Sequence, residues 1–164
     1  MKIKDVFLMA YNMEVSGMEF YDSQKAKVKS KILKDIFDHL SKMEKGHALF
    51  LKTQIENIEQ NKGVEQLPDA KDDSIFIERI KQQKIDTATL EDDLGDFSII
   101  RMAYLIEKDF EEFYRKSSEK ADEKDIKDIF NGLAEWEKGH AEMLKGRLEE
   151  IIERNSIELG FYPL

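Results

Sequence analysis

The sequence predicts an all-α protein, an antiparallel four-helix bundle built from two helical hairpins and a long crossover. Three observations lead to this fold class. Apolar residues recur at three- and four-residue spacing through four long segments, as they do on the buried face of a helix. The chain contains only two prolines, and its charged fraction of 37% suits long helices with one solvated face. The chain also repeats itself, so its two halves are expected to fold alike.

The repeat is marked by the pentapeptide Glu-Lys-Gly-His-Ala, which occurs at residues 44–48 and again at residues 137–141. An offset of 93 residues aligns residues 9–51 with residues 102–144 without a gap and gives 20 identities in 43 positions. Identity at nearly half of the aligned positions indicates an internal duplication.

The duplication predicts a single domain over residues 1–164 with two repeats and one long connection. We place the repeats at residues 7–61 and 100–154 and the crossover at residues 62–95. The apolar periodicity predicts four long helices at about residues 2–27, 30–61, 96–119 and 122–154.

The connections differ in length. The junctions within each half are short, so each half is expected to be an antiparallel hairpin. The long crossover lets the second and third long helices run parallel, because the chain must travel the length of the bundle between them. Within it, residues 74–82 could form a short extra helix. The apolar end of the chain, residues 161–164, could dock on the bundle or on a second subunit.

Two carboxylates and one imidazole of each half lie on the apolar stripes of these helices. In the second helix, Glu44 and His47 interrupt a stripe of leucines, isoleucines and phenylalanine, and Glu137 and His140 do the same in the fourth. The first and third helices each carry one glutamate among apolar neighbours. The resulting candidate metal ligands are Glu14, Glu44, His47, Glu107, Glu137 and His140.

Such a group of charges would be costly in an apolar core. An unpaired buried charge costs several kcal/mol, whereas a whole domain is stable by only about 5–15 kcal/mol. No lysine or arginine shares the stripes at this level, but two divalent cations would cancel four carboxylates. We therefore expect a two-metal site, the alternative being a metal-free bundle with chance glutamates on its core face.

The spacing within each half suits two neighbouring ions. Residues three apart on a helix lie one turn apart on nearly the same face, so Glu-x-x-His can hold one cation and leave a carboxylate oxygen for the next. We expect Glu44 and Glu137 to bridge the ions and Glu14 and Glu107 to bind one ion each.

Two tyrosines recur at equivalent places in the repeats. Tyr21 and Tyr114 each lie two turns from a glutamate on the same helix face. We expect their hydroxyls to hydrogen-bond the candidate ligands of the partner helix, as groups around metal sites often do. The alternative is a core tyrosine whose hydroxyl is satisfied elsewhere.

Composition excludes several classes of protein. The absence of cysteine excludes disulfides, iron–sulfur clusters and thiolate metal sites. The net charge of −9 argues against a nucleic-acid partner, because phosphate contacts need a basic surface. No apolar run is long enough to span a membrane, and the first residues lack the apolar core of a signal peptide. We therefore expect a cytoplasmic protein without a membrane partner.

The repeated pattern resembles that of the ferritin-like diiron-carboxylate superfamily, in particular its rubrerythrin and erythrin branch. The residues that carry the resemblance read Ala10, Glu14, Phe20-Tyr21, Phe37, Leu40, Glu44, His47, and then Ala103, Glu107, Phe113-Tyr114, Phe130, Leu133, Glu137, His140. The resemblance covers roughly residues 7–152 and implies a ferritin-like bundle with two iron ions. Manganese and zinc also suit these oxygen and nitrogen donors.

The resemblance implies a diiron redox enzyme that reduces hydrogen peroxide or dioxygen. Rubrerythrins carry a rubredoxin domain whose iron needs four cysteines, which this chain lacks, so we expect electrons from a separate donor protein. The alternatives are ferritin-like iron oxidation and iron handling, as in bacterioferritin, or a metal-binding bundle without catalysis. We further expect a homodimer.

One departure from the rubrerythrin pattern concerns an extra glutamate one turn after the third-helix ligand. Phe110 stands there, and Gly17 takes the equivalent place in the first half, so we do not expect ligand switching. Glu111 could supply an extra ligand, but a surface position is the simpler expectation. His39 is also expected at the surface, because it lies off the metal-facing stripe and Gly132 replaces it in the other half.

Overall fold

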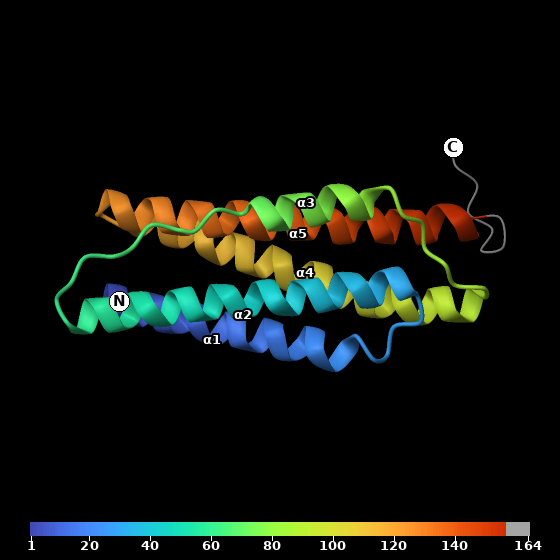
Figure 1. Ribbon diagram of the computed structural model, residues 1–164, viewed down its shortest axis with the longest axis horizontal. Helices are drawn as coiled ribbons and strands as arrows, with labels where there is room; N and C mark the ends of the chain where they lie inside the picture. Colours follow the sequence, from blue (N-terminus) through green and yellow to red (C-terminus); the bar gives the residue numbers. More distant parts are fainter. Residues whose placement is uncertain (157–164) are drawn as a thin grey trace.

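The computed structural model describes residues 1–156, and every regular element within them is an α-helix (Figure 1). The helices in chain order are α1 (Ile3–Gln24), α2 (Lys31–Glu59), α3 (Lys71–Lys81), α4 (Leu90–Lys120) and α5 (Lys124–Asn155). The all-α prediction is therefore confirmed. The apolar end of the chain, residues 161–164, lies outside the described residues.

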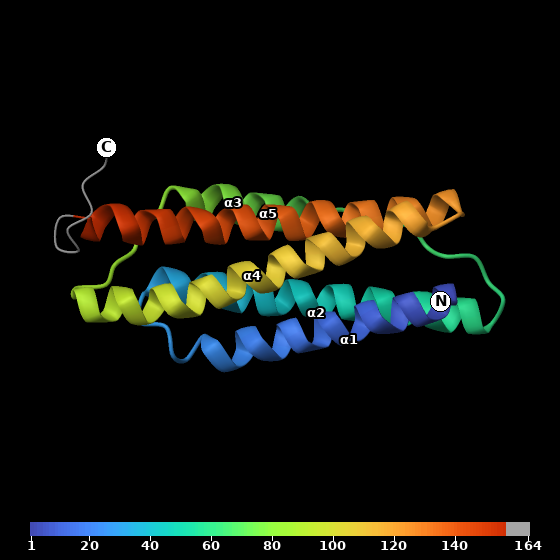
Figure 2. The ribbon, with the colours of Figure 1, turned by 180° about the vertical axis from the view of Figure 1, so that it is seen from behind.

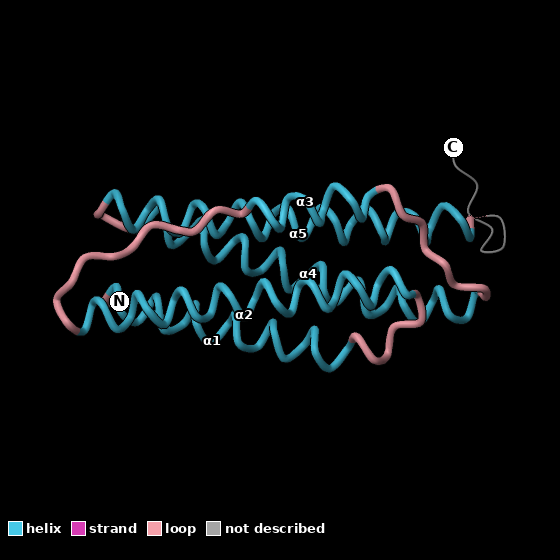
Figure 3. Tube along the Cα trace, in the orientation of Figure 1, coloured by secondary structure: helices cyan, strands magenta, loops and turns pink. Residues whose placement is uncertain are grey.

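The four long helices pair as two antiparallel hairpins, α1 with α2 and α4 with α5 (Figure 1). Short connections at residues 25–30 and 121–123 join the partners of each hairpin. Since α2 and α4 run in the same direction, the connection between them passes along the bundle, and its loops are pink in Figure 3. Seen from behind, α4 runs obliquely between α1 and α5 (Figure 2). The predicted bundle of two hairpins with a long crossover is confirmed.

The helix α4 begins at Leu90, earlier than the predicted residue 96. Thr89 caps its first turn, because its hydroxyl oxygen accepts a hydrogen bond of 3.1 Å from the backbone N–H of Asp92. Acidic residues in the first turn add to this stabilisation by facing the positive end of the helix dipole. Gly95, which we assigned to the crossover, therefore lies inside a helix.

The two hairpins are joined at one end by a side-chain cap. The carboxylate of Asp96 on α4 accepts hydrogen bonds from the backbone N–H groups of Lys29, at 2.7 Å, and Ser30, at 2.9 Å. These residues precede α2, so a carboxylate of the second hairpin satisfies backbone donors at the start of a helix in the first. This contact fixes α4 against α2 near the end of the bundle.

Two apolar clusters fill the bundle, and the repeat relates them. Phe37 and Leu40 belong to one cluster, and their equivalents Phe130 and Leu133 belong to the other. All four side chains are fully buried. Within residues 1–156 no helix is both long and apolar enough to cross a membrane. The level between the two clusters is where the candidate ligands lie.

The crossover makes the two halves unequal. Its helix α3 lies beside α5 (Figure 1), and Arg147 of α5 holds the end of α3 by hydrogen bonds to the backbone carbonyls of Ile80 and Gln83. Leu67 packs on Gly132 of α5 so closely that a β-carbon on the glycine would meet it. The equivalent residues of α2 contact the crossover in a different way: Gln54 accepts a hydrogen bond of 2.7 Å from the backbone N–H of Glu65, and His39 donates one to Asp73. The crossover therefore breaks the symmetry of the duplication.

Candidate metal centre

The structure brings all six candidate ligands together in the middle of the bundle. None of these side chains is more than 2% exposed. Each long helix contributes at mid-length, α1 and α4 with one glutamate and α2 and α5 with Glu-x-x-His. We call this set the Glu/His cluster; its members are Glu14, Glu44, His47, Glu107, Glu137 and His140.

The Glu/His cluster divides into two groups of four donors. One group consists of Glu14, Glu44, His47 and Glu137, and the other consists of Glu44, Glu107, Glu137 and His140. Within each group, one donor atom per residue lies within 4.8 Å of the others. The two groups share Glu44 and Glu137, so each group combines one imidazole, one glutamate of its own and two shared glutamates. Two ions held in these groups would therefore be neighbours.

Both imidazoles direct Nδ1 toward the carboxylates. The Nδ1 atom of His47 lies 3.1 Å from Glu137 Oε1 and 3.4 Å from Glu14 Oε2. The Nδ1 atom of His140 lies 3.2 Å from Glu137 Oε2 and 3.5 Å from Glu107 Oε2. The two rings are nearly parallel, with centroids 6.2 Å apart. The same nitrogen of each histidine is thus positioned to bind an ion.

Several buried atoms of the cluster have no hydrogen-bond partner among residues 1–156. They include both oxygens of Glu44, one oxygen of each of the other three glutamates, and Nδ1 of His47, which lies near Glu137 but without hydrogen-bond alignment. Buried polar atoms in proteins are nearly always paired. Within residues 1–156, moreover, the ion pairs of these glutamates involve only the two histidines and no lysine or arginine. The donors that remain free are those that two divalent cations would bind, so the residues fit a two-metal centre.

The pKa values reflect this crowding. Burial raises the pKa of Glu44 well above its usual value, and neighbouring carboxylates add to the effect. Burial and the charge of Glu137 likewise raise the pKa of Glu107 to about 8. Burial would lower the pKa values of His47 and His140, but the carboxylates around them raise both well above the usual range. Burial would raise the pKa of Glu137, but the two imidazoles that it faces hold it below its usual range. Without bound cations, these pKa values favour the retention of protons by the cluster at neutral pH.

The two tyrosines connect the hairpins at the cluster. The hydroxyl of Tyr21 donates a hydrogen bond to Oε1 of Glu107, and the hydroxyl of Tyr114 donates one to Oε1 of Glu14. Both tyrosines are fully buried. Each bond runs from one repeat to the other and leaves Oε2 of the glutamate without a hydrogen-bond partner in the described part of the chain. The predicted hydrogen bonds to glutamates are therefore present, and they leave one oxygen of each glutamate free for an ion.

The crossover supplies a residue that we did not predict. Asp73, in the first turn of α3, accepts hydrogen bonds from Nε2 of His140, at 3.1 Å to Oδ2, and from Nε2 of His39, at 2.7 Å to Oδ1. Burial would raise the pKa of Asp73, but these two histidines hold it below the usual range. The only sequence signal for this residue was the acidic start of the short helix, Asp72-Asp73, just before residues 74–82.

The expectation that His39 lies at the surface is wrong. Its side chain is only 15% exposed and is covered by α3, where its ring stacks on Phe76 with centroids 3.8 Å apart. The stripe of α2 that faces the bundle does not include His39, but the crossover covers a second face of this helix. His39 is therefore buried by an element that lies outside the repeat.

Glu111 does not join the Glu/His cluster. It is only 8% exposed, so the expected surface position is wrong. Its carboxylate pairs with Lys108, at 2.6 Å, and with Arg115, at 3.3 Å. Burial would raise its pKa, but these cations hold it below the usual value. Glu111 is thus committed to ion pairs on α4.

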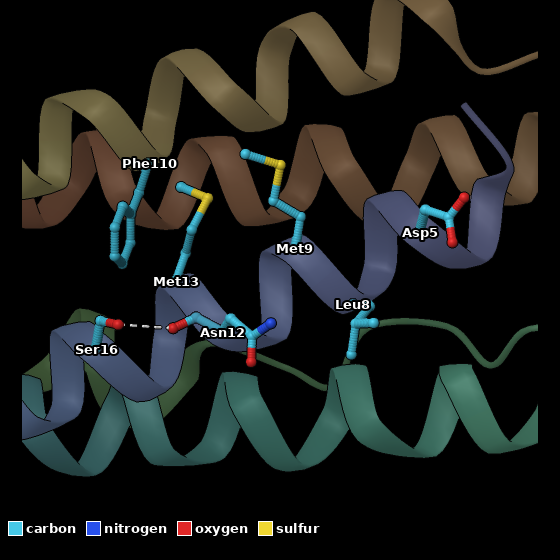
Figure 4. Close-up of a pocket in the computed structure, with 7 residues that line it drawn as sticks. All are labelled: Asp5, Leu8, Met9, Asn12, Met13, Ser16 and Phe110. Atoms are coloured by element: carbon cyan, nitrogen blue, oxygen red, sulfur yellow. Dashed lines mark hydrogen bonds between the residues drawn. The ribbon is translucent and has the colours of Figure 1, made fainter.

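A groove of about 460 Å³ along α1 ends at Phe110 of α4 (Figure 4). Its other lining residues all belong to α1: Asp5, Leu8, Met9, Asn12, Met13 and Ser16. Phe110 lies close to the cluster as well, because a β-carbon on Gly17 would be 3.1 Å from its ring and 3.5 Å from the side chain of Glu44. Phe110 therefore lines the groove and also lies beside Gly17, next to which Glu44 lies as well.

Comparisons with known proteins agree with this arrangement. A family model described as Rubrerythrin matches residues 5–148, which include all four long helices for most of their length. A solved structure, described as a hypothetical protein from Pyrococcus furiosus, superimposes with a TM-score of 0.69 over 94% of this chain and 92% of its own. Its sequence is 24% identical, so it supports the fold alone. The chain has no significant match among curated proteins.

Proposed function

The chain belongs to the rubrerythrin family, and we propose that it is a diiron redox enzyme that reduces hydrogen peroxide or dioxygen. The observation that carries the proposal is the sharing of Glu44 and Glu137 between two groups of four buried donors. A single-metal site has no need for two such groups. Iron is the favoured metal because carboxylate and imidazole donors suit it at sites that meet oxygen.

The proposed roles follow from the two donor groups. Glu44 and Glu137 would each serve both ions, since each belongs to both groups. Glu14 and His47 would complete the donors of the first ion, and Glu107 and His140 would complete those of the second. Four ionised glutamates would neutralise two ferrous ions within an otherwise apolar core. The tyrosine hydrogen bonds restrain Oε1 of each unshared glutamate and so support a fixed donor geometry.

The bound iron pair would supply the redox chemistry, one electron from each ion, so that peroxide and two protons give two molecules of water. The protein holds the two donor groups side by side and keeps them between apolar clusters that exclude bulk water. The groove that ends at Phe110 is the route that we propose for a small oxidant, because Phe110 and Glu44 both lie beside Gly17.

Electrons for continued turnover are proposed to come from a separate protein. The 164-residue sequence contains no cysteine, so it offers no ligands for a rubredoxin-type iron. We propose that this donor docks on the outside of the bundle.

Iron oxidation and handling is the second candidate function. It is favoured by the ion pairs of Glu111 with Lys108 and Arg115, which keep this glutamate out of the cluster. The remaining candidate ligands number six, three from each repeat, so the site is symmetric. A redox enzyme should return to the ferrous state with added reductant and react again. A protein that handles iron should instead pass ferric iron on and accumulate a mineral core.

Stopped-flow absorbance of the anaerobically iron-loaded protein tests the proposal. We expect hydrogen peroxide or dioxygen to oxidise both irons faster than it oxidises free ferrous ion, and a chemical reductant to restore the reaction over repeated cycles. Glu107→Gln should slow the oxidation, whereas Glu111→Gln, on the same helix but outside the cluster, should not. If neither oxidant reacts faster than with free ferrous ion, the redox proposal fails.

A further inference from the structure

The two imidazoles of the Glu/His cluster have different surroundings on their outer side. Nε2 of His140 lies 3.1 Å and 3.2 Å from the two carboxylate oxygens of Asp73. Nε2 of His47 is buried and has no hydrogen-bond partner among residues 1–156. The ring of His47 instead stacks on Trp136, with centroids 4.7 Å apart. The two groups offer equivalent donor residues to the ions that they would hold. They differ in the hydrogen bonds at Nε2, on the outer side of each imidazole.

This difference arises from the crossover. Asp73 lies on α3, which belongs to neither repeat, and only one α3 exists for two equivalent histidines. At the repeat-related pair of positions, His39 of α2 donates to Asp73, whereas Gly132 of α5 leaves room for Leu67. The crossover therefore places the carboxylate of Asp73 behind His140. At Gly132, the position equivalent to His39, it places the apolar side chain of Leu67 instead.

Asp73 is held firmly in this position. His39 donates to Oδ1 at 2.7 Å, and the His39 ring is fixed in turn by stacking on Phe76 of the same short helix. The backbone just after the far end of α3 is anchored by Arg147, which donates to the carbonyl of Gln83 at 2.7 Å. The carboxylate is thus restrained at 4% exposure against His140 rather than free in solvent.

We propose that Asp73 is a positioning residue that makes the two metal positions unequal, so that the position of His140 binds its ion more tightly and fills first. The inference rests on the proposed two-metal centre. A carboxylate that accepts from Nε2–H fixes the tautomer in which Nδ1 carries the free lone pair, holds the ring in place and strengthens the ligand. His47 has no such partner, so neither its tautomer nor its ring is fixed by a hydrogen bond on the outer side.

Titration of the metal-free protein with cobalt(II), followed by calorimetry and by the visible absorption of bound cobalt, tests the proposal. The wild-type protein should bind two ions in two separable steps. Asp73→Ala should weaken the tighter step by about 10–100-fold, the usual effect of removing a group that orients a ligand. The weaker step should change much less, so the two steps should merge. The spectrum of the first equivalent should also change, which a loss of general stability would not cause.

Asp72→Ala is the matched control. Asp72 is the exposed neighbour in the same turn of α3, so its removal makes the same change in charge and helix composition without touching His140. Asp73→Asn keeps an oxygen that can accept from Nε2–H, and it should recover part of the affinity if orientation matters. It also provides a second variant if Asp73→Ala does not fold.

Anomalous diffraction from crystals given one equivalent of cobalt(II) identifies the position that fills first. The expected density lies beside His140, and equal density at both positions would overturn the proposal. An equal loss of affinity at both steps in Asp73→Ala would overturn it as well, because Asp73 would then act only through the stability of the bundle. Failure of the wild-type protein to bind cobalt, manganese or iron would instead remove the metal centre itself, and this inference with it.

Discussion

Tyr21 of the first hairpin donates a hydrogen bond to Glu107 of the second. The reciprocal bond runs from Tyr114 to Glu14, so each repeat holds the unshared glutamate of the other. In both bonds the accepting oxygen is Oε1, and Oε2 has no hydrogen-bond partner within residues 1–156. The cluster is therefore assembled only when the two hairpins meet, which links metal binding to the packing of the bundle.

This link predicts the effect of removing either hydroxyl. Tyr21→Phe should weaken metal binding by about 10-fold, because Glu107 loses the bond that orients it. It should also destabilise the metal-loaded protein by about 1–3 kcal/mol, since a buried charged acceptor is left with one partner fewer. Tyr114→Phe should act alike through Glu14. Calorimetric metal titration and urea denaturation measure the two effects.

Tyr104→Phe is the control for these variants, because Tyr104 is only partly buried and does not contact the cluster glutamates through its hydroxyl. It should change neither the metal affinity nor the stability by more than a few tenths of a kcal/mol. Equal effects of Tyr104→Phe and Tyr21→Phe would show that the hydroxyl bond to Glu107 has no special role.

The sharing of glutamates predicts different losses for the two types of carboxylate. Glu44→Gln removes a charged donor from both groups and should weaken the binding of both ions. Glu14→Gln removes a donor from one group and should weaken mainly the ion beside His47. Metal content after dialysis, measured by mass spectrometry, distinguishes the two patterns. Retention of two tightly bound ions by Glu44→Gln would argue against bridging.

Much of this site can be predicted from the sequence, because the duplication presents each candidate ligand twice. Glu44 and Glu137 recur at the same place on equivalent apolar stripes, and a buried charge there needs a compensating partner. The path of the crossover also follows from its length, since α2 and α4 have to run parallel.

Asp73 and His39 could not be found in the same way. Asp73 has no repeat-related equivalent, and it is separated from His140 by 67 residues of chain. Helical periodicity identifies the face of α2 that meets α1 and α5, but not a second face covered by a short helix from the crossover. The start of α4 was missed for a local reason: Thr89 caps a helix before Gly95, and a glycine within a helix lowers its stability without ending it.

The raised pKa values predict that the metal-free protein loses stability as pH rises. Glu107 has a pKa of about 8 in the folded chain against 4.5 ordinarily, so the folded state binds a proton that the unfolded state lacks between these values. Stability therefore falls as pH rises through this window. The raised pKa values of His47 and His140 act in the same direction, since their stabilising protons are lost only at higher pH.

The depressed pKa of Glu137 has the opposite effect on stability, because stability is then lost as pH falls. This effect is confined to pH values below about 4.5. Between pH 5 and 9 we thus expect the metal-free protein to lose on the order of a few kcal/mol. Urea denaturation with EDTA, compared with denaturation in excess manganese(II), measures the difference. Bound cations replace the protons, so the gap between the two forms should widen toward pH 8 and above. A metal-free protein whose stability is constant or rises over this range would contradict the account.

The central claim, that the Glu/His cluster holds two metal ions, is tested most directly by anomalous diffraction from crystals saturated with iron or manganese. We predict two peaks about 3.5–4 Å apart, the spacing typical of two-metal sites. One ion should be bound by Nδ1 of His47 and the other by Nδ1 of His140, with oxygens of Glu44 and Glu137 contacting both. A single peak, or six side chains that remain unliganded in the presence of metal, would contradict the claim.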